Sequence, residues 1–285
     1  YGAANTVLVL AGDVTPARAE TLVRKYFSHI PPGPPVARVK SRVPERTRNT
    51  REDLYDRVPH VRSLLNWAVP GRTEKDFVLL QLAAQVLGDG KNSRLYQALI
   101  YEQQKVVELN VVAQGQEIAS MFSIDVTLKP DTSLHEINDI IEQELQLFFR
   151  DGPGEEELKR ARAKMNAHII RGLEVVGGFS GKATTLAQGE LYDGNPEFYK
   201  TRMNWINHAT TQEVREAARQ WLARGSHQVN VLPVAEHQVS KDSVDRSQGP
   251  PVVGEFPDVR FPEIERARLK NGPPASGNPR SILRF

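Results

Sequence analysis

The stretch that most constrains the fold covers residues 87–102, LGDGKNSRLYQALIYE. An apolar run at 77–87 predicts a buried helix before it. Gly88 and Gly90 are placed to end that helix, because glycine readily adopts the left-handed backbone of a helix cap. Ser93 then predicts the N-cap of a second helix. The chain must therefore turn a tight corner between two helices at this point.

Strands are predicted on both sides of the corner. Residues 61–69, VRSLLNWAV, predict a strand that Pro70 and Gly71 close, and Thr73 behind them predicts the cap of the apolar helix. Residues 106–112 and 121–128 predict a hairpin, since apolar and polar side chains alternate in the second of them. A last strand is expected at 229–232.

The second half of this region is predicted to be mainly helical. Ser133 and Glu136 have the spacing of a capping box, as do Thr210 and Glu213. The acidic run at 155–157 places negative charge at the start of a long helix. Strands and helices thus come in blocks, which predicts an α+β fold with a mostly antiparallel sheet packed on one face by helices.

Composition narrows the classes of function. Hydrophobic residues make up 39% and charged residues 25%, with a formal net charge of only +2, so nothing draws the chain to nucleic acid. There are no cysteines, which excludes disulfides and cysteine zinc sites. No apolar run approaches the roughly 18 residues of a membrane span.

Four segments resemble, in the expected order, the pitrilysin/insulinase family of zinc metallopeptidases. They are NTVLVLAGDV at 5–14, the Gly-x-x-Ser-Arg-Leu-Tyr corner at 90–96, EEELKRAR at 155–162, and TTQEV with the helix after it at 210–222. Residues 261–272 are similar to the lead into another repeat of that family.

The resemblance implies a division of the chain. Residues 1–35 would be the last strand (6–11) and helix of a preceding domain, and 36–50 a basic linker. Residues 51–235 would form a complete α+β peptidase-like domain without a zinc site. Residues 236–285 would be an extended linker toward a further repeat.

The zinc motif of the family is absent from this sequence. Members hold zinc with H-x-x-E-H and a distant Glu, where the two His lie on one helix face and the Glu activates the bound water. None of the seven histidines has another four residues away. We therefore expect no catalytic and no metal-binding residue here, and zinc only in the parent protein.

The family also supplies an Arg and a Tyr, seven apart, that bind the substrate carbonyl and the tetrahedral intermediate. The matching positions here are Ile100 and Val107, so that pair is missing. Arg94 and Tyr101 have the same spacing six residues earlier, and with Tyr96 they are candidates for a substrate cleft. The alternative is that Arg94 and Tyr96 brace the corner.

The resemblance implies a non-catalytic domain of a zinc metalloendopeptidase that forms part of a clamshell around peptide substrates. Its partner would be a zinc-bearing catalytic domain in the same chain or in another subunit, and the segment alone would be inactive. The alternative is a structural or partner-binding subunit of an inactive relative, of the processing-peptidase or respiratory core-protein type. A bacterial periplasm and a cytoplasm both remain open.

Overall fold

The computed structural model describes residues 2–34, 42–179, 181–234, 265–268 and 274–277. Backbone contacts divide the chain into two units, Tyr1–Ala235 and Glu236–Phe285. The described part of the second unit is one antiparallel pair, β6 (Glu265–Arg268) with β7 (Pro274–Gly277). Most of the predicted linker at 236–285 and part of the one at 36–50 lie outside the described residues, and the domain division stays a prediction.

The N-terminal segment contains a short 3-10 helix, η1 (Ala3–Asn5), and the helix α1 (Pro16–Phe27). Thr15 caps α1 and proline occupies its first position, as predicted. The predicted strand at 6–11 is wrong, since these residues have no regular structure and Leu8 and Leu10 are about half exposed. A strand needs a neighbour for its backbone groups, and none of the described residues pairs with this segment.

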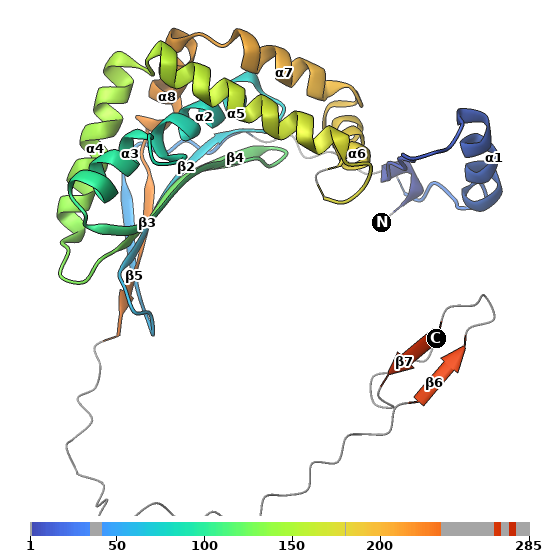
Figure 1. Ribbon diagram of the computed structural model, residues 1–285, viewed down its shortest axis with the longest axis horizontal. Coiled ribbons are helices and arrows are strands. Elements are labelled where there is room, and N and C mark those ends of the chain that lie inside the picture. The colour runs from blue at the N-terminus through green and yellow to red at the C-terminus, as the bar shows by residue number, and fades with distance from the viewer. Residues whose placement is uncertain (1, 35–41, 180, 235–264, 269–273, 278–285) are drawn as a thin grey trace, which may run out of the picture. The chain divides into compact units, whose positions relative to one another are not determined.

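The main domain is built on a five-stranded sheet (Figure 1). Its strands lie in the order β1 (Thr50–Asp56), β5 (His227–Pro233), β2 (Arg62–Pro70), β4 (Ala119–Leu128) and β3 (Val106–Gln114). Only β1 and β5 run parallel; the other three neighbouring pairs are antiparallel. The predicted hairpin forms from β3 and β4. A mostly antiparallel sheet packed against helices confirms the predicted α+β fold.

Helices cover one face of this sheet (Figure 1). They are α2 (Lys75–Gly88), α4 (Leu134–Asp151), α5 (Glu155–Glu174), α6 (Lys182–Asp193), α7 (Phe198–His208) and α8 (Thr211–Leu222). Helix α2 is apolar all round because it contacts β3 on one side and α5, α7 and α8 on the others. The core therefore lies between the sheet and this helix layer.

Of three predicted helix starts, one forms as predicted and two differ. The capping box of Thr210 and Glu213 forms as predicted. Glu74, not Thr73, is the N-cap of α2, and it makes no side-chain cap. Ser133 is the N-cap of α4 without a side-chain hydrogen bond, because Glu136 forms an ion pair with Lys105 instead of turning back to the cap.

Candidate functional site

The corner after α2 is a close-packed structural feature. A Cβ added at Gly88 would lie 2.1 Å from Val111 Cγ2 on β3, so this position has room only for glycine. Gly90 has φ +87°, a conformation that glycine adopts without strain. Ser93 Oγ donates to Gly90 O at 2.7 Å and closes the turn, and α3 (Arg94–Tyr96) starts there. The π-helical turn η2 (Gln97–Glu102) continues α3 directly.

Arg94 joins the corner to the connection between α4 and α5. Its Nε donates to Glu157 Oε1 at 2.9 Å, and its Nη2 donates to Glu157 Oε2 at 2.7 Å and to Gly152 O at 2.8 Å. The guanidinium also lies 5.2 Å from the centre of the Phe148 ring. A two-point pair of this kind fixes both distance and orientation. These contacts brace the corner.

Charge pairing and burial at the corner shift three pKa values. The hydrogen bond to Glu157 raises the pKa of Arg94 above its ordinary value, although burial opposes the change. Burial alone would raise the pKa of Glu157, but hydrogen bonds from Arg94 and the Gly154 N–H outweigh it and the pKa is lowered. Burial raises the pKa of nearby Glu144. Glu157 is thus held as a carboxylate at neutral pH.

The three candidate cleft residues do not converge. No hydrogen bond or ring contact connects Arg94 with Tyr96 or Tyr101 in the described part of the chain. Tyr96 is half-buried, and Tyr101 at the end of η2 is 70% exposed. Of the two positions where the resemblance expects Arg and Tyr, Ile100 packs against the core and Val107 is exposed. A substrate role for the three candidates stays a prediction.

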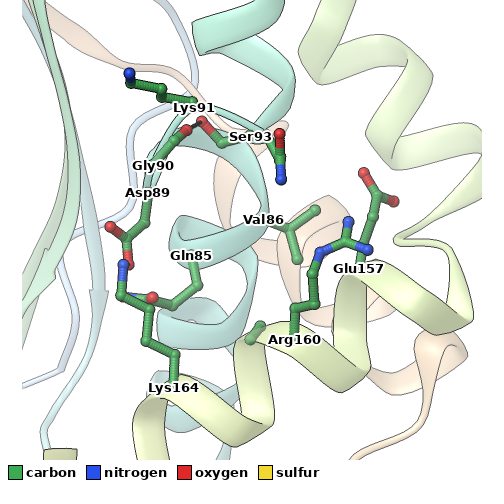
Figure 2. Close-up of a pocket in the computed structure, with 11 residues that line it drawn as sticks. Gln85, Val86, Asp89, Gly90, Lys91, Ser93, Glu157, Arg160 and Lys164 are labelled. Atoms are coloured by element: carbon green, nitrogen blue, oxygen red, sulfur yellow. Dashed lines mark hydrogen bonds and ion pairs between the residues drawn. The ribbon is translucent and has the colours of Figure 1, made fainter.

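A hollow of about 190 Å³ lies beside the corner, between the end of α2 and the start of α5. Figure 2 shows Asp89 and Lys164 meeting at one end of it, with Nζ and Oδ2 2.5 Å apart, and Glu157 and Arg160 at the other. Glu157 forms an ion pair with Arg94, and Asp89 forms one with Lys164. These charged side chains therefore join the start of α5 to the corner after α2.

In the part of the chain that the structure describes, no helix covers the other face of the sheet (Figure 1). The strand register places Leu54, Val231, Arg62 and Thr127 in one row across this face. Leu54 is 45% exposed, whereas Ile124 and Val126 on the helix side of β4 are fully buried. Polar pairs cross the same face: Arg62 Nε donates to Asp125 Oδ1 at 2.8 Å, and Ser123 Oγ to Asn66 Oδ1 at 2.8 Å.

A buried polar network on the helix side ties β1 to the sheet, and sequence reasoning missed it. Gln228 Nε2 donates to Ser63 Oγ at 2.8 Å and to Asn138 Oδ1 at 3.0 Å. Asn230, fully buried, donates from Nδ2 to Asp53 Oδ1 at 2.7 Å. Each partner lies far away in the sequence, so no local pattern marks the network.

The described residues do not fit a zinc ion. No group of three or more His, Asp and Glu side chains among them could hold a metal. His208 hydrogen-bonds its own helix at Asn204 O, and His227 hydrogen-bonds Thr50 Oγ1 at 2.9 Å. In the same residues, no helix is both long enough and apolar enough to cross a bilayer.

The sequence profile of the family described as "Peptidase M16 inactive domain" matches residues 1–165. This chain belongs to that family. The resemblance to pitrilysin/insulinase peptidases is therefore confirmed. Zinc is bound by the catalytic domains of this family. Inactive M16 domains typically pair with such a catalytic domain.

Several solved structures have a similar fold. A protease from Helicobacter pylori superimposes with a TM-score of 0.69 and 17% identity, over 78% of this chain and 54% of that one. A peptidase M16 inactive domain from Pseudomonas fluorescens gives 0.65 and 17%, over 78% and 52%. A chain of complex III2 from Candida albicans gives 0.56 and 14%, over 64% and 45%. None of the curated proteins compared with the chain matches it.

The chain thus spans about half the length of these proteins. At such identities the likeness establishes the fold only.

Proposed function

We propose that this chain is the non-catalytic half of a zinc metallopeptidase, in which its uncovered sheet face forms one wall of a chamber that encloses a peptide. The zinc-bearing domain would come from the same polypeptide or from a partner subunit. The peptide bond would be cut there, and this chain alone would be inactive.

The observation that carries the proposal is the bare face of the sheet. An antiparallel sheet with one solvated face ordinarily alternates apolar and polar residues, with the polar ones outward. Here the outward face keeps apolar side chains exposed, with Leu54 at 45%, Val112 at 39% and Met121 at 36%. Between them lie side-chain amides and hydroxyls. A face of this mixed kind suits an extended peptide, whose side chains vary while its backbone is always polar.

A second candidate function is a structural subunit of an inactive relative. It is supported by the fold shared with a chain of complex III2 from Candida albicans. In that case the bare face would be an assembly surface, and no zinc would be present in the partner either.

The two functions separate in one experiment. Zinc content and cleavage of a quenched fluorescent peptide are measured for this chain and for the chain extended upstream by a full domain. The peptidase function predicts that only the extended chain holds zinc and cuts. Absence of both from the extended chain would favour the structural subunit. Zinc and cleavage in the short chain alone would contradict both.

The wall itself is tested with two neighbouring residues of β1. Leu54→Glu alters the bare face, whereas Tyr55→Glu, at the other side of the same strand, is the matched control, because Tyr55 is also well exposed at 70%. In the cleaving form we expect Leu54→Glu to raise KM about threefold to tenfold, as loss of one apolar contact would. The control should leave KM unchanged. Equal effects of both substitutions would argue against the wall.

A further inference from the structure

Strand β3 is an edge of the sheet, and its outward backbone groups can be identified. Among the described residues, β3 has β4 as its only strand partner. Leu128 N donates to Val61 O beside β2 at 2.9 Å, so the even-numbered residues of β4 bond β2 and the odd-numbered ones bond β3. The register places even-numbered residues of β3 opposite those odd-numbered residues. The backbone N–H and C=O groups that point away from the sheet are therefore those of Leu109, Val111 and Ala113.

The two edges of the sheet differ in how they resist a foreign strand. The opposite edge, β1, carries the charged side chains of Arg51, Glu52, Asp53 and Asp56. Charges of this kind discourage pairing with another chain. In β3, VVELNVVAQ, Glu108 is the only charged residue, lysine and proline are both absent, and the bulge lies at the start of the strand. An apolar edge without these protections is a template for an added strand.

A hollow of about 310 Å³ lies along this edge, between β3 and the helices α2, α5 and α7. Val111, Val112 and Ala113 line it in succession. Because successive side chains of a strand point to opposite faces, three residues in a row line one hollow only where the backbone itself contributes. The helices add the apolar side chains of Ala84, Met165 and Ile169. A strand added about 4.8 Å beyond β3 would direct every second side chain toward this hollow.

The α5 side of the hollow is basic. Lys164, His168 and Arg171 line it, and their spacing of four and three residues places them on one face of α5. All three are exposed. Lys164 forms an ion pair with Asp89, but in the described part of the chain neither His168 nor Arg171 has an acidic partner. No Asp or Glu is among the described residues that line the hollow, so its charge favours an acidic ligand.

We propose that β3 binds an extended segment of a partner protein as a sixth strand, with an apolar side chain in the hollow and an acidic side chain two positions away beside Arg171. Residues two apart in a strand share a face and lie about 7 Å from each other, so one side of the segment supplies both. Backbone hydrogen bonds hold the segment, and the two side chains select it. The site goes beyond the proposed function, because it lies at the sheet edge, not on the bare face, and its occupation needs neither zinc nor cleavage.

The first test selects ligands for the full chain from a library of random octapeptides displayed on phage. We expect enrichment of sequences in which an apolar and an acidic residue are separated by one position. The enriched peptide is then synthesised with both ends blocked, and its Kd is measured by fluorescence anisotropy. No enrichment, or apolar residues repeated at the helical spacing of three and four, would overturn the proposal.

N-methylation of the selected peptide tests strand addition directly. Only alternate residues of an added strand turn their N–H groups toward β3. Methylation of that alternate set should weaken binding at least about tenfold, whereas methylation of the other set should change the Kd by less than about twofold. Equal effects of the two sets would overturn the strand geometry.

Variants of the chain localise the binding. Ala113→Pro removes an outward N–H and leaves the bonds to β4 in place, so it should weaken the peptide at least about tenfold. Arg171→Glu should weaken it about threefold to tenfold, and should have no effect on the same peptide with Asn in place of its acidic residue. Lys159→Glu, an exposed position of α5 outside the hollow, is the matched control and should leave the Kd unchanged.

Three results would count against the assignment. Equal effects of Arg171→Glu and Lys159→Glu would overturn the acidic position of the ligand. A dimer in sedimentation equilibrium that Ala113→Pro converts to a monomer would show that a second copy of this chain, not a partner segment, occupies the edge. If Ala113→Pro does not fold, the two methylated peptides on the unaltered chain still decide.

Discussion

Two arginines beside α2 handle burial in opposite ways. Arg94 at the corner has a carboxylate at two points, a backbone carbonyl and an aromatic ring around its guanidinium. Arg202, in the cavity between α2, α5 and α7, has one neutral amide and a second cation nearby. The first arrangement pairs the buried charge with a carboxylate. The second leaves a charge that no carboxylate among the described residues compensates, which costs stability.

The comparison teaches where to look for function in a domain for which the sequence predicts no catalytic residue. The sequence points to Arg94, because the family places catalytic groups near the corner. In the structure, Arg94 forms an ion pair with Glu157 and so joins the corner to α5. Arg202, which no motif singled out, has a buried Nε without a hydrogen-bond partner.

The largest expected effect is on the corner. Arg94→Met removes a two-point charged pair and leaves Glu157 half-buried without its cation, so we expect a loss of about 2–3 kcal/mol in the free energy of unfolding. Urea unfolding followed by circular dichroism measures it. Arg160→Met on α5 is the control and should stay within about 0.5 kcal/mol. An equal loss in the free energy of unfolding for both variants would show that the Arg94–Glu157 pair does not stabilise the corner.

The pH dependence of the same pair sharpens the comparison. The folded pKa of Glu157 is lowered, so its ionised form contributes stability that is fully present above the unfolded pKa of about 4.3 and is lost as pH falls through the folded pKa. The stability advantage of the unaltered chain over Glu157→Gln should therefore shrink between about pH 6 and about pH 3. Urea midpoints across that range measure it. A gap that stays constant or widens on acidification would contradict the assigned pairing.

The smallest effect has the opposite sign. Arg202→Met replaces an uncompensated buried cation by an apolar chain of similar length, so the free energy of unfolding should stay level or rise by up to about 1 kcal/mol. Thermal and urea unfolding without ligand measure it. A loss comparable to that of Arg94→Met would erase the distinction between the two arginines and place Arg202 among the structural braces.

Much of the fold follows from local patterns. The apolar run before the corner, the hairpin of β3 and β4, the acidic start of α5 and the capping box of α8 were all predicted from neighbouring residues. Strand β1 was missed, because its sequence TREDLYD contains few apolar side chains. It is an edge strand that pairs in parallel with β5. Thr50 lies opposite His227, which is far away in the sequence.

The predictions that failed have a common cause. The segment at 6–11 has the composition of a strand but no strand beside it. Ser133 and Glu136 have the spacing of a capping box, but Lys105 from another part of the chain takes the carboxylate. A local pattern states what a segment favours alone, and partners elsewhere in the chain decide the outcome. None of the described residues pairs with 6–11, and Lys105 draws the Glu136 carboxylate away from the cap.

The sequence by itself determined that this is an α+β domain of the pitrilysin/insulinase family and that it carries no H-x-x-E-H motif. The fold class rests on periodicity and helix ends, the family on the resemblance of four segments, and the missing motif on residue identity, and all of these can be read from local sequence. Only the tertiary structure showed that Arg94 pairs with Glu157 and that, among the described residues, no helix covers one sheet face and no carboxylate pairs with Arg202. Each of these depends on which side chains meet across long stretches of chain, because charge pairing and burial are set by neighbours in space.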